Sequence, residues 1–200
     1  MTLVMLAFLS TVSALAALTP AQVLQKTASL INSAKGVDCR FSASGAQGSI
    51  NGNVKASGSR FAVLTPQAST WFDGRTMWTA NSSSRETTVT VPTAEEIAET
   101  NPLAYINGYQ NLYNLYFSRR KEAGRYLVLL NPKKKNSGIK AVEIAVNAKT
   151  FKPERIIIRQ SNDQRVTVNI RSLNLSASIP EASLTYPAAS YKDYELVDLR

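Results

Sequence analysis

The sequence predicts a mainly β fold of the α+β class: one antiparallel sheet, strongly curved or closed, with an N-terminal helix and a helical insert. Apolar and polar residues alternate with a period of two from Val37 onward, as they do in half-buried strands. Turn residues separate these segments at hairpin distances, most clearly at Asp73-Gly74. Two stretches of the chain have helical spacing, and we expect the helices to cover the concave face of the sheet or to plug its mouth.

The first 16 residues have the pattern of a secretory signal peptide. The segment is uncharged, has an apolar run over residues 3–9, and ends in Ala14-Leu15-Ala16, an A-x-A cleavage pattern. It has no Lys or Arg before the apolar run, which departs from the usual pattern. A transmembrane anchor is the alternative, but the run is shorter than the ~20 residues that cross a bilayer. We therefore expect export, and a single domain over residues 17–200.

The first helix is predicted to begin at Thr19-Pro20, because threonine is a good N-cap and proline is tolerated at the first helical position. Apolar residues then recur at helical spacing until Gly36, which should end the helix. The strands that follow are expected over residues 37–43, 49–57, 60–65, 69–72, 76–80 and 85–91.

The helical insert begins after Pro92. Thr93 and Glu96 form a capping box, and Asn101-Pro102 is expected to start a helix that continues to Phe117. Its tyrosines are spaced by four, four and three residues, which places an aromatic stripe on one helix face: Tyr105, Tyr109, Tyr113 and Tyr116. The stripe fits ordinary core packing or a movable lid, because a tyrosine ring packs while its hydroxyl stays wet.

The rest of the chain returns to strands. We expect them over residues 125–130, 139–146, 154–160 and 164–175, with short elements at 183–186 and 194–197. No repeat or linker divides the chain, so the strands should form one sheet with helices covering a face.

The composition argues against an enzyme. The sequence contains no histidine, which removes Ser-His-Asp and Cys-His catalysis and the commonest metal ligand. The single cysteine, Cys39, cannot form an internal disulfide and should be buried on a strand. A carboxylate-based hydrolase remains as an alternative, but Glu95, Glu96 and Glu99 lie on one short segment and do not flank a cleft. No cofactor is expected.

The net charge of +9 raises the question of nucleic acid, but the basic residues are spread along the chain. Dense clusters occur only at 119–121 and 133–135. They fit a solvated basic surface, or attraction to anionic lipid headgroups at ~1 kcal/mol per residue. Export argues against a nucleic-acid partner.

Several motifs, in order along the chain, resemble the outer-membrane lipoprotein carrier protein family, the LolA type. The hairpin Trp71-Phe72-Asp73-Gly74-Arg75-Thr76-Met77-Trp78 resembles the family's DGKTLW hairpin, and Asn101-Pro102 its NTP step into the lid helix. Leu184-Thr185-Tyr186-Pro187 and the ending Asp198-Leu199-Arg200 resemble its closing F-x-x-P and D-x-R. The segment Glu95-Glu96-Ile97 and the DLR ending are nearest to the Bacteroidota branch.

The resemblance implies a half-open, strongly curved antiparallel β-barrel with helices as a lid over an apolar cavity. It also implies a monomeric periplasmic chaperone whose cavity holds the acyl chains of lipoproteins. Its partners would be acylated lipoproteins, an inner-membrane lipoprotein-releasing ABC transporter complex and an outer-membrane acceptor. One departure concerns Arg60: family members carry an Arg-Pro pair before the hairpin, whose arginine contacts the lid, and here no proline follows Arg60. The lid-latching role is therefore not transferred to it.

Burying one CH₂ group is worth roughly 0.8 kcal/mol, so an acyl chain needs a container to cross water. We expect the container to be lined by sheet and lid residues, namely Phe61, Val63, Trp71, Trp78, Leu103, Ile106, Tyr109, Leu112 and Tyr113. A related module for phospholipid or glycolipid, or a lipoprotein sensor, is the alternative that the same fold allows.

Overall fold

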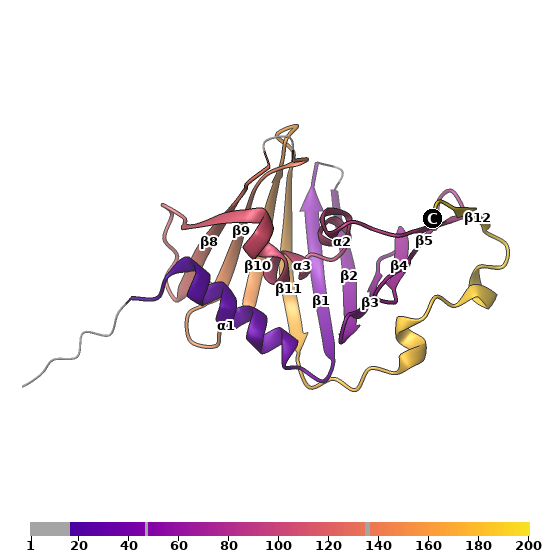
Figure 1. Ribbon diagram of the computed structural model, residues 1–200, viewed down its shortest axis with the longest axis horizontal. Coiled ribbons are helices and arrows are strands. Elements are labelled where there is room, and N and C mark those ends of the chain that lie inside the picture. The colour runs from indigo at the N-terminus through magenta and orange to yellow at the C-terminus, as the bar shows by residue number, and fades with distance from the viewer. Residues whose placement is uncertain (1–16, 47, 135–136) are drawn as a thin grey trace, which may run out of the picture.

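The protein is built on one 12-stranded sheet with the strand order β12-β6-β5-β4-β3-β2-β1-β11-β10-β9-β8-β7. The computed structural model describes residues 17–46, 48–134 and 137–200. Neighbouring strands are antiparallel except β12 and β6, which are parallel. The sheet is curved and does not close on itself (Figure 1). The prediction of a mainly β chain with one curved sheet is confirmed.

Apart from β7, which was predicted to be helical, the strand bounds follow the predicted alternation closely. They are β1 Val37–Gly45, β2 Gly48–Ser57, β3 Arg60–Leu64, β4 Ala68–Phe72, β5 Met77–Asn81, β6 Glu86–Thr90, β7 Tyr113–Phe117, β8 Arg125–Pro132, β9 Ile139–Asn147, β10 Pro153–Gln160, β11 Arg165–Asn174 and β12 Glu195–Asp198. The turn between β4 and β5 is tight, because Asp73 accepts hydrogen bonds from the N–H groups of Arg75 and Thr76, and Gly74 takes a φ of +105°.

The predicted capping box at Thr93 is present, and the predicted N-cap Thr19 forms a second capping box with Gln22. Helix α1 spans Pro20–Asn32 and α2 spans Ala94–Thr100, and each is preceded by a threonine whose hydroxyl accepts a hydrogen bond from the backbone N–H three residues later. Helix α1 ends at Asn32, four residues before Gly36, because Ser33 already caps its last carbonyls. It runs diagonally across one face of the sheet (Figure 1).

The prediction of one helix from 101 to 117 is wrong. Two four-residue helices form instead, α3 Ala104–Asn107 and α4 Tyr109–Leu112, and Tyr113 begins β7. Residues 113–117 pair with β8 along the edge of the sheet, from Tyr113 opposite Pro132 to Phe117 opposite Val128. The spacing of the tyrosines fits a helix, but pairing with β8 supplies hydrogen bonds that favour a strand.

The C-terminal segment crosses the other face of the sheet. After β11 it forms two 3₁₀ turns, η1 Glu181–Leu184 and η2 Ala188–Tyr191, before β12 joins β6. In Figure 1 this yellow segment lies beyond β3, β4 and β5, away from the helices. We call residues 175–200 the C-terminal tail, and the two faces of the sheet the helix-covered face and the tail-covered face.

Two apolar clusters follow from this arrangement. The larger fills the space between the helix-covered face and α1–α4, and the smaller lies under the tail. Strand β3 shows the division: Phe61 and Val63 point into the first cluster, while Ala62 and Leu64 belong to the second. Cys39 is buried in the first cluster, as predicted.

In the part of the chain that the structure describes, no helix is long and apolar enough to cross a membrane. The predicted signal peptide, residues 1–16, lies outside the described residues.

Candidate functional site

A cavity of about 520 Å³ lies on the helix-covered face, between the hairpin of β2 and β3 and the helices. The end of α1 contributes Ile31, the sheet contributes Phe61 and Phe72, and α2 contributes Ile97 and Ala98. Residues 101–113 close it from above. Its size lies in the range of small-molecule sites, which are mostly apolar with a few placed polar groups.

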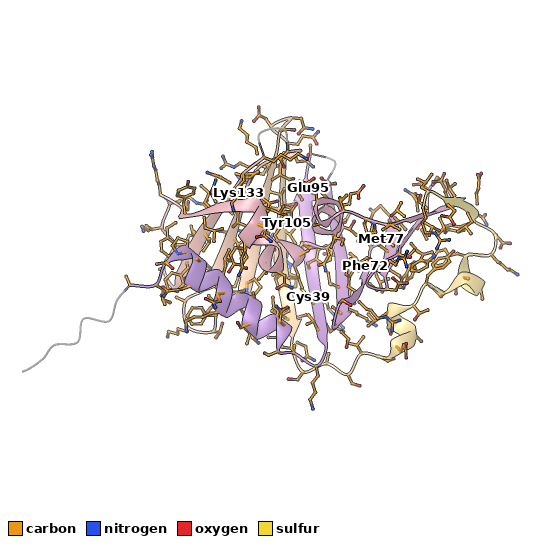
Figure 2. All side chains as sticks on the ribbon, in the orientation of Figure 1. Cys39, Phe72, Met77, Glu95, Tyr105 and Lys133 are labelled. Carbon is orange, nitrogen blue, oxygen red and sulfur yellow. The ribbon has the colours of Figure 1, made fainter. Side chains whose placement is uncertain are left out.

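Phe61 and Phe72 form the aromatic floor of this cavity. They are directly opposite on β3 and β4, and their ring centroids are 5.2 Å apart. Figure 2 places Phe72 and Met77 near the end of the sheet where the tail lies, and Tyr105 over the centre of the sheet. All three belong to the larger apolar cluster on the helix-covered face. The floor therefore continues the main core and does not form a separate patch.

Two buried tyrosines form part of the roof. Tyr105 is 2% exposed and meets Tyr113 edge to face at 6.4 Å between ring centroids. Burial, with Tyr113 and Glu99 close by, raises the pKa of Tyr105 far above its ordinary value. Burial also raises the pKa of Tyr113, with Glu95 and Glu99 adding to the effect. Both hydroxyls stay neutral at physiological pH, so the roof carries no charge from them.

Among the described residues that line the cavity, Arg60 alone is charged, and its guanidinium is directed toward the C-terminal tail. Its guanidinium donates to Glu181 at 2.8 Å and to the hydroxyl of Thr185 at 3.0 Å, both on the C-terminal tail. These hydrogen-bond partners of Arg60 therefore lie on the tail and not on the helical insert. This position joins the cavity rim to the tail, a link that the sequence did not predict.

The structure brings four of the nine predicted site residues to the cavity wall: Phe61, Leu103, Leu112 and Tyr113. Three others, Val63, Ile106 and Tyr109, are buried in the same cluster but do not line the cavity. The short helices direct Ile106 and Tyr109 into the core between α1 and the sheet, where both are nearly inaccessible.

The structure separates Trp71 and Trp78 from the cavity. They are directly opposite on β4 and β5 and belong to the cluster under the tail. Trp71 meets Tyr186 and Tyr191 edge to face at 5.6 and 5.5 Å, and Trp78 stacks on Tyr186 at 6.1 Å. Alternation places neighbours in a strand on opposite faces, so Phe72 takes the cavity position that the sequence analysis assigned to Trp71.

Sequence reasoning missed several wall residues, above all Phe72, Ile97 and Ala56. The alternation showed that Trp71 and Phe72 point to opposite faces. The pairing of Phe72 with Phe61, a residue already assigned to the cavity, was the signal that could have decided between them.

The cavity wall is mainly a surface for binding. Among the described residues, no group of three or more His, Cys, Asp and Glu side chains could hold a metal ion. Apart from Arg60, the polar side chains of the wall are amides and hydroxyls, such as Asn101, whose side-chain oxygen accepts a hydrogen bond from the N–H of Leu103 at 3.1 Å. Such a wall suits a ligand that is apolar over most of its length.

Comparison with solved structures shows the same fold in distant proteins. An uncharacterized conserved protein from Thermus thermophilus aligns with a TM-score of 0.60 at 13% identity, covering 89% of this chain and 98% of that one. A DUF1329 family protein from Desulfovibrio piger aligns with a TM-score of 0.51 at 9% identity, covering 85% and 98%. At these identities the likeness concerns the fold alone.

A putative outer membrane lipoprotein-sorting protein domain from Vibrio parahaemolyticus aligns with a TM-score of 0.49 at 10% identity, covering 85% of this chain and 97% of that one. A comparison with curated protein sequences finds no match. The family profile described as outer membrane lipoprotein carrier protein LolA matches residues 9–162, which is most of the chain. The chain therefore belongs to the LolA family of outer membrane lipoprotein carrier proteins.

Proposed function

We propose that this protein is a non-enzymatic periplasmic chaperone that carries acylated lipoproteins from the inner to the outer membrane. The observation that supports the proposal is the cavity between the β2–β3 hairpin and the helical insert, walled by aromatic and aliphatic side chains. Acyl chains would lie against Phe61 and Phe72, under Leu103 and Leu112. An inner-membrane lipoprotein-releasing ABC transporter would supply the cargo, and an outer-membrane acceptor would receive it.

The helical insert has the properties of a movable cover. Helices α3 and α4 have four residues each and no side-chain cap hydrogen bond. Isolated helices of that length are unstable in water, so packing holds this segment in place, together with hydrogen bonds from Lys133 to the carbonyls of Gln110 and Leu112 at its end. A ligand that replaces those contacts can displace residues 101–112 without breaking a strand pair. This segment is the lid in our proposal.

A carrier must also release its cargo. Each buried CH₂ contributes roughly 0.8 kcal/mol, so full enclosure of two or three acyl chains would give a complex too stable to unload. The cavity of about 520 Å³ opens to the surface, so it would enclose part of such a cargo and leave the rest for the next partner.

The test is native mass spectrometry of residues 17–200 with a triacylated lipoprotein and with its deacylated form. We expect one-to-one binding that depends on the acyl chains. The variant Leu112→Gln should weaken binding about tenfold, the equivalent of roughly two buried CH₂ groups. The matched control is Leu115→Gln, because Leu115 is also half-buried but does not line the cavity.

Other outcomes would change the assignment. Binding of phospholipid or glycolipid with no preference for the acylated lipoprotein would favour a related lipid-binding module or a lipoprotein sensor. Equal weakening by both leucine variants would mean that the cavity is not the binding site. Absence of any bound lipid would contradict the proposal.

A further inference from the structure

A second hollow, of about 740 Å³, lies over β7–β11 on the face opposite the cavity. The alternation of side chains along the strands shows on which face of the sheet this hollow lies. Val128, Ile144 and Ile156 belong to the core cluster on the helix-covered face. Residues one position away, such as Leu129 and Ile157, line the hollow and so point the other way. We call this hollow the basic groove.

Two arginines lie side by side in the groove. Arg159 on β10 and Arg165 on β11 are register partners, and both side chains are exposed. Directly opposite residues in an antiparallel pair have Cβ atoms about 5 Å apart, and like charges in that position destabilise the sheet. Among the described residues, neither arginine has a carboxylate partner within ion-pair distance. A bound anion would remove this repulsion.

The remaining charges of the groove leave it positive. Glu143 is its only acidic wall residue among those described, and it already accepts a hydrogen bond from Arg120 at 2.8 Å. Lys140 is paired with Asp163 at 2.6 Å on the adjoining turn. Arg119 adds a third exposed guanidinium to those of Arg159 and Arg165. An anion entering the groove would therefore meet cations whose charge is not already neutralised.

The floor of the groove is apolar, with Leu129, Ala141 and Ile157 beneath the arginines. Tyr116 stands beside them and is 52% exposed, on the edge strand β7. A small inorganic anion would need only the guanidinium groups. An apolar floor next to them, with a half-exposed tyrosine, matches the polar-apolar boundary of an amphiphile, where tyrosine is enriched.

We propose that the basic groove binds the phosphate headgroup of an anionic phospholipid at a membrane surface. Arginine suits the role because its planar fork donates two parallel hydrogen bonds to phosphate oxygens. The groove lies on the opposite face of the sheet from the acyl-chain cavity, so this inference does not depend on the proposed carrier function.

The experiment measures binding of residues 17–200 to vesicles of phosphatidylcholine with and without phosphatidylglycerol. We expect binding only to the anionic vesicles, weakening as salt is added. The double variant Arg159→Gln/Arg165→Gln should bind at least about tenfold more weakly. The matched control Arg40→Gln/Arg171→Gln removes two exposed charges outside the groove and should change binding by less than about threefold.

A third variant separates loss of the site from loss of the fold. Arg159→Glu creates an opposite-charge pair with Arg165, so its melting temperature should rise while anionic vesicle binding falls. Equal weakening by both double variants would overturn the proposal in favour of diffuse attraction to the net charge. Binding of inorganic phosphate through the same arginines, without vesicle binding, would overturn the lipid assignment. Failure to bind anionic vesicles at all would overturn it too.

Discussion

Truncation of Trp71 should destabilise the protein strongly and leave ligand binding intact. Trp71 is 5% exposed and packs against Tyr186 and Tyr191 of the tail. Replacing a buried tryptophan by alanine costs about 3–5 kcal/mol, because the transfer energy of the ring and the cavity it leaves both count. The two aromatic pairs are part of that cost, at about 0.5–1.5 kcal/mol each.

The melting temperature translates this cost into a measurable shift. For a chain of this size, 1 kcal/mol corresponds to roughly 2–4 °C, so Trp71→Ala should melt about 6–20 °C below the parent protein. Far-ultraviolet circular dichroism during heating gives the shift. Limited proteolysis adds a second measurement, because the loosened tail should be cleaved faster at the exposed Lys192.

The neighbouring residue gives the matched comparison. Phe72→Ala removes part of the cavity floor, so it should weaken binding of an acylated lipoprotein as well as lower the melting temperature. Both variants are compared at a temperature where each is folded. If Trp71→Ala lost about tenfold or more in ligand affinity while its circular dichroism matched the parent, the separation of the two faces would be refuted.

Three further predictions concern single positions. Burial, aided by the nearby Asp38 carboxylate, raises the pKa of the Cys39 thiol to about 12, so a maleimide should label it at pH 8 only after unfolding. A hydrogen bond from Arg155 lowers the pKa of Glu122 in the folded protein. The ionised Glu122 therefore stabilises the fold above about pH 4.3, and this contribution is lost as the pH falls through the lowered pKa of the folded state. Melting temperatures of Glu122→Gln should accordingly vary less between neutral and acidic pH than those of the parent protein. A Cβ at Gly52 would meet the ring of its neighbour Phe41 below 3 Å, so Gly52→Ala should lower the free energy of unfolding by about 1–3 kcal/mol in a urea titration.

The sequence predicted those elements whose signals are local. Thr93 is followed three residues later by Glu96, and the capping box formed where that spacing indicated. Thr19 caps the first helix with Pro20 at its first position, also as predicted. The Asp73-Gly74 turn formed as well, since an aspartate that accepts backbone hydrogen bonds and a glycine with positive φ define it without help from the rest of the chain.

The assignment of faces needed information from far along the chain. Alternation shows that Trp71 and Phe72 point to opposite sides, but not which side holds the cavity. The answer depends on the tail, which places Tyr186 and Tyr191 over Trp71 from more than 100 positions away. The tryptophans looked like cavity residues because nothing in the local pattern shows that the sheet is apolar on both faces here.

The prediction of one long helix in the insert failed for a similar reason. The spacing of its tyrosines is that of a helix, but β8 offers an unpaired edge, and Tyr113–Phe117 satisfy their backbone groups there. Pairing of this kind depends on which strand ends the sheet. Tertiary context therefore overrode the local pattern, and it shortened the expected lid to residues 101–112.

The two covers of the sheet differ in how they are held, and this bears on which of them can open. The tail is fixed by backbone hydrogen bonds from Glu195 and Leu199 to β6 and its approach, by the ring packing of Trp71, and by the bond from Arg60. The helical segment is held mainly by side-chain packing, which an apolar ligand can replace contact for contact. Displacing the tail would leave strand hydrogen bonds unmade, whereas displacing the helices would break the hydrogen bonds from Lys133 and otherwise exchange one apolar surface for another. In the proposed carrier, opening would therefore take place on the cavity side, with the tail holding the floor of the cavity from behind.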